Sequence, residues 1–290
     1  MAEKQLTFDD VKTWPEPPHT GNRVKIKSLN HPLWTETKAK LISQYLRYFL
    51  FITHHGTYID GFAGPQNADD ADSWAAKLVL DIEPKWLRNF FLCEQNRNSY
   101  DALSSMVAAQ VSPKTRAIET RFGDFNEYVK AVLDSGVITD KEATFALLDQ
   151  RTFECDWSTV QALAGHKSTN KIELFYFFPT GWLSRSISGL KERKEEQMVR
   201  WWGDSSWTEL VGKRTNVQVQ MMLTRIQSLG YADVKSWPIF ERENGGGKVM
   251  YHMIHATDHD EAPKLMWRAY RRVGSGDADV EQLAFEWGED

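Results

Sequence analysis

Residues 57–66, TYIDGFAGPQ, decide how the rest of the chain is interpreted. Apolar and β-prone residues run into an acid, Asp60, and the chain then turns on Gly61 and Gly64. Such a stretch is either a tight turn without chemical function or a ligand-binding turn. In the second case the glycines let the backbone approach a ligand closely, and the acid binds a cationic or hydroxyl-bearing group. The neighbouring strands decide between the two, because open α/β sheets bind ligands at the carboxyl ends of their strands.

Strand-like and helix-like segments alternate along the chain from residue 35 to residue 179. The strand-like segments are apolar throughout instead of alternating, which is typical of parallel strands that are buried on both faces. They cover residues 57–59, 90–93, 116–120, 143–148 and 171–179, and helical spacing predicts helices over 35–51, 74–82, 99–110, 125–133 and 157–165. We therefore expect a parallel α/β sheet that helices cover on both faces.

The pattern changes after the fifth strand. A mostly helical insertion is predicted over 181–213, followed by a helix over 215–229, two strands over 234–242 and 248–256 that the turn ENGGGK joins, and a helix over 263–270. The predicted organisation is an extended N-terminal arm (1–34), one α/β domain (35–273) and an acidic C-terminal tail (274–290). The sheet of this domain would have seven strands, mostly parallel, and would end in an antiparallel hairpin.

The composition bounds the function classes. The 290 residues are 41% hydrophobic and include 12 tryptophans, which is enough to bury a large core. The 35 basic and 40 acidic residues give a net charge of −5, which neither indicates nor excludes a nucleic-acid partner. Two cysteines make no disulfide framework, so we expect a reducing, cytoplasmic compartment. No apolar run approaches the ~20 residues of a membrane span, and the polar N-terminus lacks a signal-peptide core.

Acidic residues follow four successive predicted strands. They are Asp60, Glu94, Asp124 and Asp149. An acid after the second strand can accept hydrogen bonds from both hydroxyls of a ribose, as Glu94 would. Asp124 can bind an adenine amine while Phe125 covers the ring, and Asp149 would face the reacting group. Each acid also has a purely structural explanation, since Asp-Gly is common in turns and Asp124 is placed to cap the next helix.

Three motifs resemble a known family. YIDGFAGP (58–65) resembles motif I of class I S-adenosyl-L-methionine (SAM)-dependent methyltransferases, particularly the DxFAGxG form of nucleic-acid methyltransferases. With LLDQRTFECDW (147–157) and YHMIHATDH (251–259), residues 35–273 resemble the three-Cys-motif partner proteins (TcmP), a bacterial methyltransferase-like family. The resemblance implies a Rossmann-like class I methyltransferase fold, SAM as cofactor, and a three-cysteine, radical-SAM-like partner protein.

The same resemblance implies a set of cofactor-binding residues. These are Asp60, Gly61, Phe62, Ala63, Gly64, Glu94, Asp124 and Phe125. Two features depart from the family pattern. Pro65 and Gln66 stand where motif I usually has another glycine. Glu94 also lies further along the chain than the ~20 residues expected in a simple βαβ unit, because the connecting loop is long.

The end of the fourth strand, DQRTF (149–153), indicates the chemistry of the reaction. Methyltransferases that act on base amines usually carry Asp/Asn-Pro-Pro-aromatic here. In this chain Asp149 and Gln150 would supply the hydrogen-bond acceptors and Phe153 would stack on the substrate, although the Pro-Pro turn is absent. Arg151 would repel a sulfonium, so we expect it either to face an anionic substrate or to pair with Asp149 or Glu154. Asp149, Gln150 and Arg151 are the predicted catalytic residues.

The insertion combines basic and aromatic residues that suit a nucleic acid. Trp182, Arg185, Arg193 and Arg200 are predicted to bind the substrate through stacking and phosphate contacts. Interspersed glutamates allow the alternative of an ordinary solvated helix. No metal site is predicted, since His252 and His255 would face opposite ways on a strand. Cys155 lacks the context of a nucleophile, so we expect a buried, inert thiol.

These observations favour a SAM-dependent methyltransferase that acts on nucleic acid or on a group linked to it. One alternative is a catalytically degenerate fold that binds a nucleotide or RNA and serves the three-cysteine partner. Another is a methyltransferase for a small molecule or a protein. The acids at the strand ends favour catalysis, whereas the missing Pro-Pro turn favours the degenerate binding protein.

Overall fold

The computed structural model describes residues 35–66, 71–111, 113–180, 183, 192–240 and 249–275. The predicted N-terminal arm, the first part of the insertion, the ENGGGK turn and the acidic tail lie outside these residues. So do most of the long loop after Gln66 and the side chains of residues 35–37, 192–194, 240 and 274–275.

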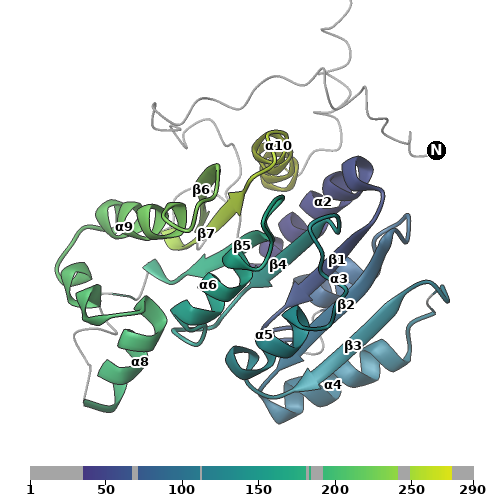
Figure 1. Ribbon diagram of the computed structural model, residues 1–290, viewed down its shortest axis with the longest axis horizontal. Helices are drawn as coiled ribbons and strands as arrows, with labels where there is room; N and C mark the ends of the chain where they lie inside the picture. Colours follow the sequence, from purple (N-terminus) through teal and green to yellow (C-terminus); the bar gives the residue numbers. More distant parts are fainter. Residues whose placement is uncertain are drawn as a thin grey trace, which may run out of the picture.

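The described strands form one seven-stranded sheet with the order β3-β2-β1-β4-β5-β7-β6 (Figure 1). The strands are β1 (Gly56–Asp60), β2 (Leu87–Glu94), β3 (Ala117–Phe122), β4 (Thr144–Leu148), β5 (Glu173–Phe178), β6 (Asp233–Phe240) and β7 (Val249–Thr257). The first five are parallel to one another, and β7 is antiparallel to both β5 and β6. This is the predicted class I methyltransferase fold, with its strand order reversing between β1 and β4.

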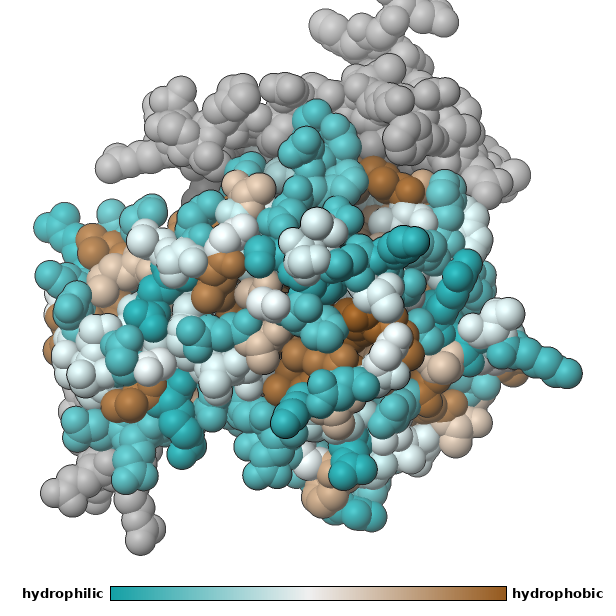
Figure 2. Space-filling model, viewed as in Figure 1, coloured by the Kyte–Doolittle hydropathy of each residue, from teal (hydrophilic) through white to brown (hydrophobic). Residues whose placement is uncertain are grey.

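Helices cover both faces of the sheet, and a separate hydrophobic core lies under each layer. One layer contains α2 (Thr35–Thr53), α3 (Ala75–Leu80), α4 (Arg97–Ala108) and α10 (Ala262–Ser275). The other contains α5 (Phe125–Leu133), α6 (Trp157–Gly165), α8 (Glu192–Trp202) and α9 (Thr215–Gln227), with the 3-10 turn η3 (Ser205–Leu210). The second layer faces the viewer in Figure 2, which shows a mostly hydrophilic surface with hydrophobic residues gathered near its centre.

The predicted elements of the α/β domain are confirmed, with ends that shift by a few residues. Asp72 and Ser73, which precede α3, lie in the 3-10 turn η2 (Ala71–Ser73). The N-cap is Trp74, whose side chain makes no capping hydrogen bond. Among the described helices, none combines the length and the apolar composition that a bilayer crossing requires.

The register of three neighbouring strands brings three acids to one place. Asp60 lies opposite Leu92 of β2 and opposite Leu147 of β4. Glu94 and Asp149 each come two residues after these partners. Because side chains on a strand alternate between faces with a period of two, all three acids are directed to the same face. That face is the one that α2 and α3 cover.

Candidate active site

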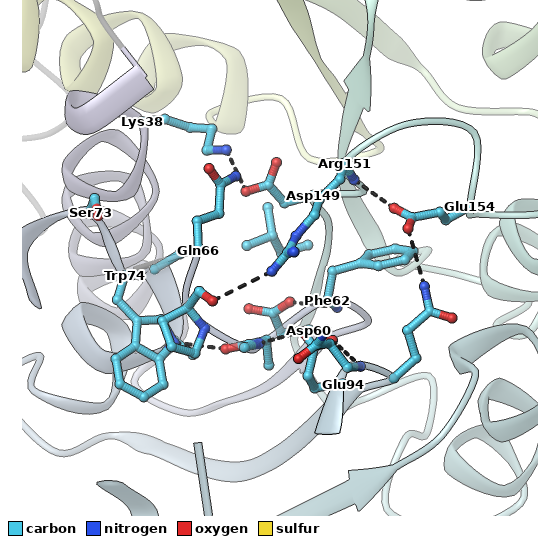
Figure 3. Close-up of a pocket in the computed structure, with 18 residues that line it drawn as sticks. Lys38, Asp60, Phe62, Gln66, Ser73, Trp74, Glu94, Asp149, Arg151 and Glu154 are labelled. Atoms are coloured by element: carbon cyan, nitrogen blue, oxygen red, sulfur yellow. Dashed lines mark hydrogen bonds and ion pairs between the residues drawn. The ribbon is translucent and has the colours of Figure 1, made fainter. Parts of the chain in front are cut away.

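A cavity of about 520 Å³ lies at the carboxyl ends of β1, β2 and β4 (Figure 3). Its wall consists of the turn after β1, the start of α3, the ends of β2 and β4, and Lys38 from α2. Pockets for small molecules and cofactors commonly occupy ~300–1,000 Å³ at such a reversal of strand order. The acids Asp60, Glu94 and Asp149 all line this cavity.

Asp60 is a buried carboxyl group that also builds its own turn. Its side chain is 1% exposed, and it accepts hydrogen bonds from the Phe62 amide (3.0 Å) and the Tyr58 hydroxyl (2.9 Å). Burial raises the pKa of Asp60 to about 7, against the opposing effect of these two hydrogen bonds, and the charges of Asp149 and Glu94 add to the rise. The first motif is therefore both a side-chain-stabilised turn and a titratable group at the cavity.

Glu94 connects the end of β2 to the turn after β1. One oxygen accepts a hydrogen bond from the Gly64 amide (3.1 Å) and the other from the Asn96 amide (2.6 Å). A carboxylate offers about four acceptor positions, so capacity remains for hydroxyl groups in the cavity. A Cβ atom at Gly64 would lie 2.4 Å from Oε2 of Glu94, so a larger residue here would displace the carboxylate.

The turn itself is held on both sides. The amide of Ala63 donates to the carbonyl of Cys93 (2.8 Å), and the indole of Trp74 donates to the carbonyl of Ala63 (2.7 Å). A Cβ atom at Gly61 would lie 2.5 Å from the ring of Phe125. These contacts fix the backbone of the turn before any ligand arrives, which reduces the entropic cost of binding.

Lys38 is the residue of the cavity that sequence reasoning missed. Its Nζ lies 2.6 Å from Oδ2 of Asp149, and the two side chains are 6% and 15% exposed. Burial lowers the pKa of Lys38, but the charges of Asp149, Tyr251 and Asp60 and the hydrogen bond to Asp149 outweigh it, so the pKa lies above its usual value. Lys38 therefore stays protonated. One sequence signal could have identified Lys38 as a residue of the buried face of the helix. It lies three residues before Leu41, which is buried, and residues at this spacing share a helix face.

Arg151 crosses the cavity and does not pair with Asp149. Its backbone amide donates to Glu154 (2.8 Å), and its guanidinium reaches the carbonyl of Pro65 (3.4 Å), as Figure 3 shows. Within the described residues, no carboxylate forms an ion pair with this guanidinium. Glu154, the other expected ion-pair partner, accepts a hydrogen bond from the backbone amide of Arg151 and not from its guanidinium. Arg151 thus brings a positive charge to the cavity wall, where its side chain is exposed.

Gln150 and Phe153 lie outside the cavity. Gln150 is 1% exposed, accepts hydrogen bonds from the amides of Glu154 and Cys155 (2.8 Å each), and donates to the carbonyl of Phe177 (3.1 Å). Phe153 is 6% exposed, and its ring lies 4.8 Å from that of Trp201. Both side chains hold the segment after β4 in place.

Asp124 and Phe125 also lie outside the cavity wall. Asp124 is exposed and caps α5 by accepting a hydrogen bond from the Asn126 amide (2.9 Å). Phe125 is 2% exposed and packs against Phe62, with ring centres 6.5 Å apart. The geometry thus agrees with the capping explanation for Asp124.

The insertion contributes little to the described site. Trp182 and Arg185 lie outside the described residues, as does the side chain of Arg193. Arg200, on α8, is 61% exposed, and its Nε lies 3.5 Å from Oδ1 of Asp156. Such an exposed ion pair contributes at most ~1 kcal/mol, so Arg200 can exchange it for another anion.

The remaining candidate groups are structural. Cys155 is fully buried, and burial raises the pKa of its thiol far above the usual range. His252 contacts Thr180 (3.0 Å), whereas His255 contacts Glu173 (2.8 Å). No group of three or more His, Cys, Asp or Glu side chains could hold a metal ion within the described part of the chain.

Comparison with known proteins gives distant structural likenesses. No protein-family model and no curated protein sequence matches the chain, so membership of the three-Cys-motif partner family stays a prediction. The methyltransferase domain of bacterial CtHen1-CN is similar at 13% identity and a TM-score of 0.44, over 77% of this chain and 99% of that domain. Wild-type Trm5b from Pyrococcus abyssi is similar at 12% identity and a TM-score of 0.37, over 74% of this chain and 48% of that one. Because both TM-scores are below 0.5, the fold rests on the strand order.

Proposed function

We propose that the cavity binds SAM and that the protein is a SAM-dependent methyltransferase. The observation that carries this proposal is the convergence of Asp60, Glu94 and Asp149 on one face of three adjacent strands, around a preformed cavity. A structural role for one such acid is common, but three buried or half-buried acids in one cavity are costly to fold without a ligand.

The residues fit this cofactor in charge and shape. SAM carries a positive sulfonium and a positive ammonium group, and the four acids of the cavity outnumber its two basic side chains. Glu94 offers acceptors for ribose hydroxyls beside the Gly64 turn, where a Cβ atom would displace its carboxylate. The cavity volume of about 520 Å³ suits a ligand of this size.

When bound, the cofactor supplies an electrophilic methyl group. Asp149, held through one oxygen by Lys38, accepts a hydrogen bond from the N–H or O–H of the nucleophile with its other oxygen. Lys38 fixes the direction of the carboxylate through this ion pair. Most of the rate then comes from alignment of the nucleophile with the methyl group, which the rigid strand ends impose.

Nucleic acid, or a group linked to it, is the substrate that we propose. Arg151 supports this because its exposed guanidinium stands at the cavity without an ion-pair partner among the described residues. A guanidinium in that place binds a phosphate in bidentate fashion and thereby keeps its charge away from the sulfonium. The three-cysteine partner protein stays an expectation from the sequence resemblance.

One observation favours a second candidate, a non-catalytic nucleotide-binding protein. Gln150 and Phe153, which would hold and stack the substrate, are used inside the fold. Of the two predicted acceptors, Asp149 and Gln150, Asp149 alone then lines the cavity, and Lys38 already occupies one of its oxygens.

A methyl-transfer assay separates the candidates. The purified protein is incubated with methyl-labelled SAM and total RNA or DNA from a strain that lacks the gene. We expect label in one nucleic acid, and at least a ~100-fold loss in Asp149→Ala with little change in SAM affinity. Binding of SAM without transfer, alone or with the three-cysteine partner, would favour the second candidate. Absence of SAM binding would contradict both the cofactor and the proposed function.

A further inference from the structure

Among the described strands, β3 forms one edge of the sheet. Within the described residues, β3 pairs with β2 alone (Figure 1). Its sequence is AIETRF, in which Ala117, Glu119, Arg121 and Phe122 are exposed and the other two residues are half-buried. An exposed edge presents a row of unpaired backbone N–H and C=O groups, which favours pairing with another strand.

Two common protections of an edge strand, a proline and a β-bulge, are missing from β3. The strand contains no proline, and its register with β2 is regular over all six residues. Phe122 is 44% exposed at its end, and Val111, in the connection from α4 to β3, is 93% exposed. These are two of the four large hydrophobic side chains that are exposed in the described part of the chain. Exposed apolar residues beside an open strand edge are typical of an interaction surface.

The sequence of β3 is complementary to itself. If two copies pair in antiparallel fashion about Thr120, Glu119 of each copy lies opposite Arg121 of the other, and Ile118 lies opposite Phe122. Directly opposed residues of an antiparallel pair are close enough for ion pairs and apolar contacts, each contributing ~0.2–1 kcal/mol. The two-fold axis forms each of these pairs twice. Edge strands are commonly protected by charges of one sign, which repel each other when two copies meet. In β3 the opposed charges, Glu119 and Arg121, are of opposite sign.

Contacts within the chain hold these side chains in place for such pairing. The hydroxyl of Tyr128 donates to the carboxylate of Glu119, and the guanidinium of Arg121 lies 5.7 Å from the centre of the Tyr128 ring. Both charged groups are thus fixed on the α5 side of the sheet while their side chains stay exposed. At the other face, the ring centre of Phe122 lies 5.4 Å from that of Tyr100 and 5.2 Å from Cζ of Arg97.

We propose that a second copy of this chain docks on the edge of β3, so that the two sheets join into one continuous sheet across a two-fold axis. The occupant is a copy of the chain because an antiparallel second β3 places a basic residue opposite each acidic one and an apolar residue opposite Ile118 and Phe122. The residues of β3 do not line the cavity. This inference does not depend on the proposed function.

Charge exchange across the axis provides the test. We expect sedimentation velocity of the wild type over a concentration series to show a species of twice the monomer mass. Glu119→Arg or Arg121→Glu alone sets like charges opposite each other, and each should weaken dimerisation by at least ~10-fold in Kd. The double variant with both changes should restore it. Glu127→Arg, an exposed change on α5, is the matched control and should leave the dimer intact.

A cross-link locates the axis directly. Thr120→Cys places a thiol opposite its own copy, so mild oxidation should give a disulfide-linked dimer, whereas Thr115→Cys, exposed before β3, should give none. The native cysteines Cys93 and Cys155 are buried and should not interfere. A wild type that is monomeric at every concentration would overturn the proposal, as would a dimer that both single charge reversals leave unchanged. Two negative results together would overturn it too: a double variant that does not recover dimerisation, and a Thr120→Cys variant that forms no disulfide-linked dimer.

Discussion

Lys38 Nζ lies 2.6 Å from Oδ2 of Asp149 in a setting where neither side chain is more than 15% exposed. The pair connects α2, which precedes the sheet in sequence, to the end of β4 in the middle of the sheet. Loss of one partner would leave the other charge buried without compensation. That cost is larger than the net stability that the pair itself contributes.

Lys38→Met should therefore destabilise the protein by about 2–4 kcal/mol, because the largely buried carboxyl group of Asp149 would lose its ion-pair partner. Urea unfolding at neutral pH measures this change. Lys40→Met is the matched control on the same helix, since Lys40 pairs with Asp72 and both are exposed (49% and 76%). The control should cost less than ~1 kcal/mol. Equal effects of the two substitutions would show that the burial of the Lys38–Asp149 pair adds nothing to its energetic weight.

Asp60 should give the stability a pH dependence of unusual sign. Its pKa is about 7 in the fold but near ~4 in an unfolded chain, so between these values the folded state holds the extra proton. Stability should then fall as the pH rises from about 4 to 7, by up to about 4 kcal/mol from this group. Asp60→Asn keeps the acceptor for the Phe62 amide but cannot ionise. The variant should lose this slope when denaturation midpoints are measured across the range, and an unchanged slope would assign it to other groups.

Binding of SAM should depend on the same proton. A cation in the cavity favours ionised Asp60, so SAM affinity should rise with pH up to about 7 and then level off. Calorimetric titrations in buffers with different ionisation enthalpies should detect proton release on binding near pH 6. Asp60→Asn should abolish this release. Release that persists in the variant would assign the proton to another group.

Glu94 and Asp124 should behave differently although both follow a strand. Glu94→Ala should weaken SAM binding by ~1–3 kcal/mol, because acceptors of charged hydrogen bonds are lost inside the cavity. Asp124→Ala should hardly change SAM affinity, but it should cost ~1 kcal/mol of stability because Asp124 caps α5. Titration and unfolding of both variants separate the effects. A larger loss of SAM affinity in Asp124→Ala than in Glu94→Ala would restore the adenine-binding role predicted for Asp124.

Gly64→Ala tests the close approach in the turn. The added Cβ would lie 2.4 Å from Oε2 of Glu94, so the carboxylate must move and SAM affinity should fall about as much as in Glu94→Ala. Gly165→Ala is the control, because a Cβ there meets no atom within 4 Å. It should leave SAM affinity unchanged. Normal binding by Gly64→Ala would mean that Glu94 can adjust without loss.

The sequence predicted the strands and the acids of the cavity well, because both follow from local patterns. Apolar runs identify strands, and an acid at the end of a parallel strand is placed by the alternation of side chains alone. The same alternation could have excluded Gln150, which follows Asp149 and faces the opposite side of the sheet.

Other features depended on contacts between distant parts of the chain. Lys38 was recognisable as a lysine on the buried face of a helix, but its partner, Asp149, is more than a hundred residues away in sequence. Phe153 was expected to stack on a substrate, and its place against Trp201 is set by the path of the segment after β4. Such paths depend on tertiary packing that no local pattern contains.

The most direct test of the central claim is a calorimetric titration of the purified wild-type protein with SAM, repeated with Glu94→Ala. We predict micromolar binding by the wild type, competition by S-adenosylhomocysteine, and an affinity at least ~10-fold lower in Glu94→Ala, which corresponds to ~1.4 kcal/mol. A wild type that gives neither heat nor a shift in melting temperature with SAM would contradict the account.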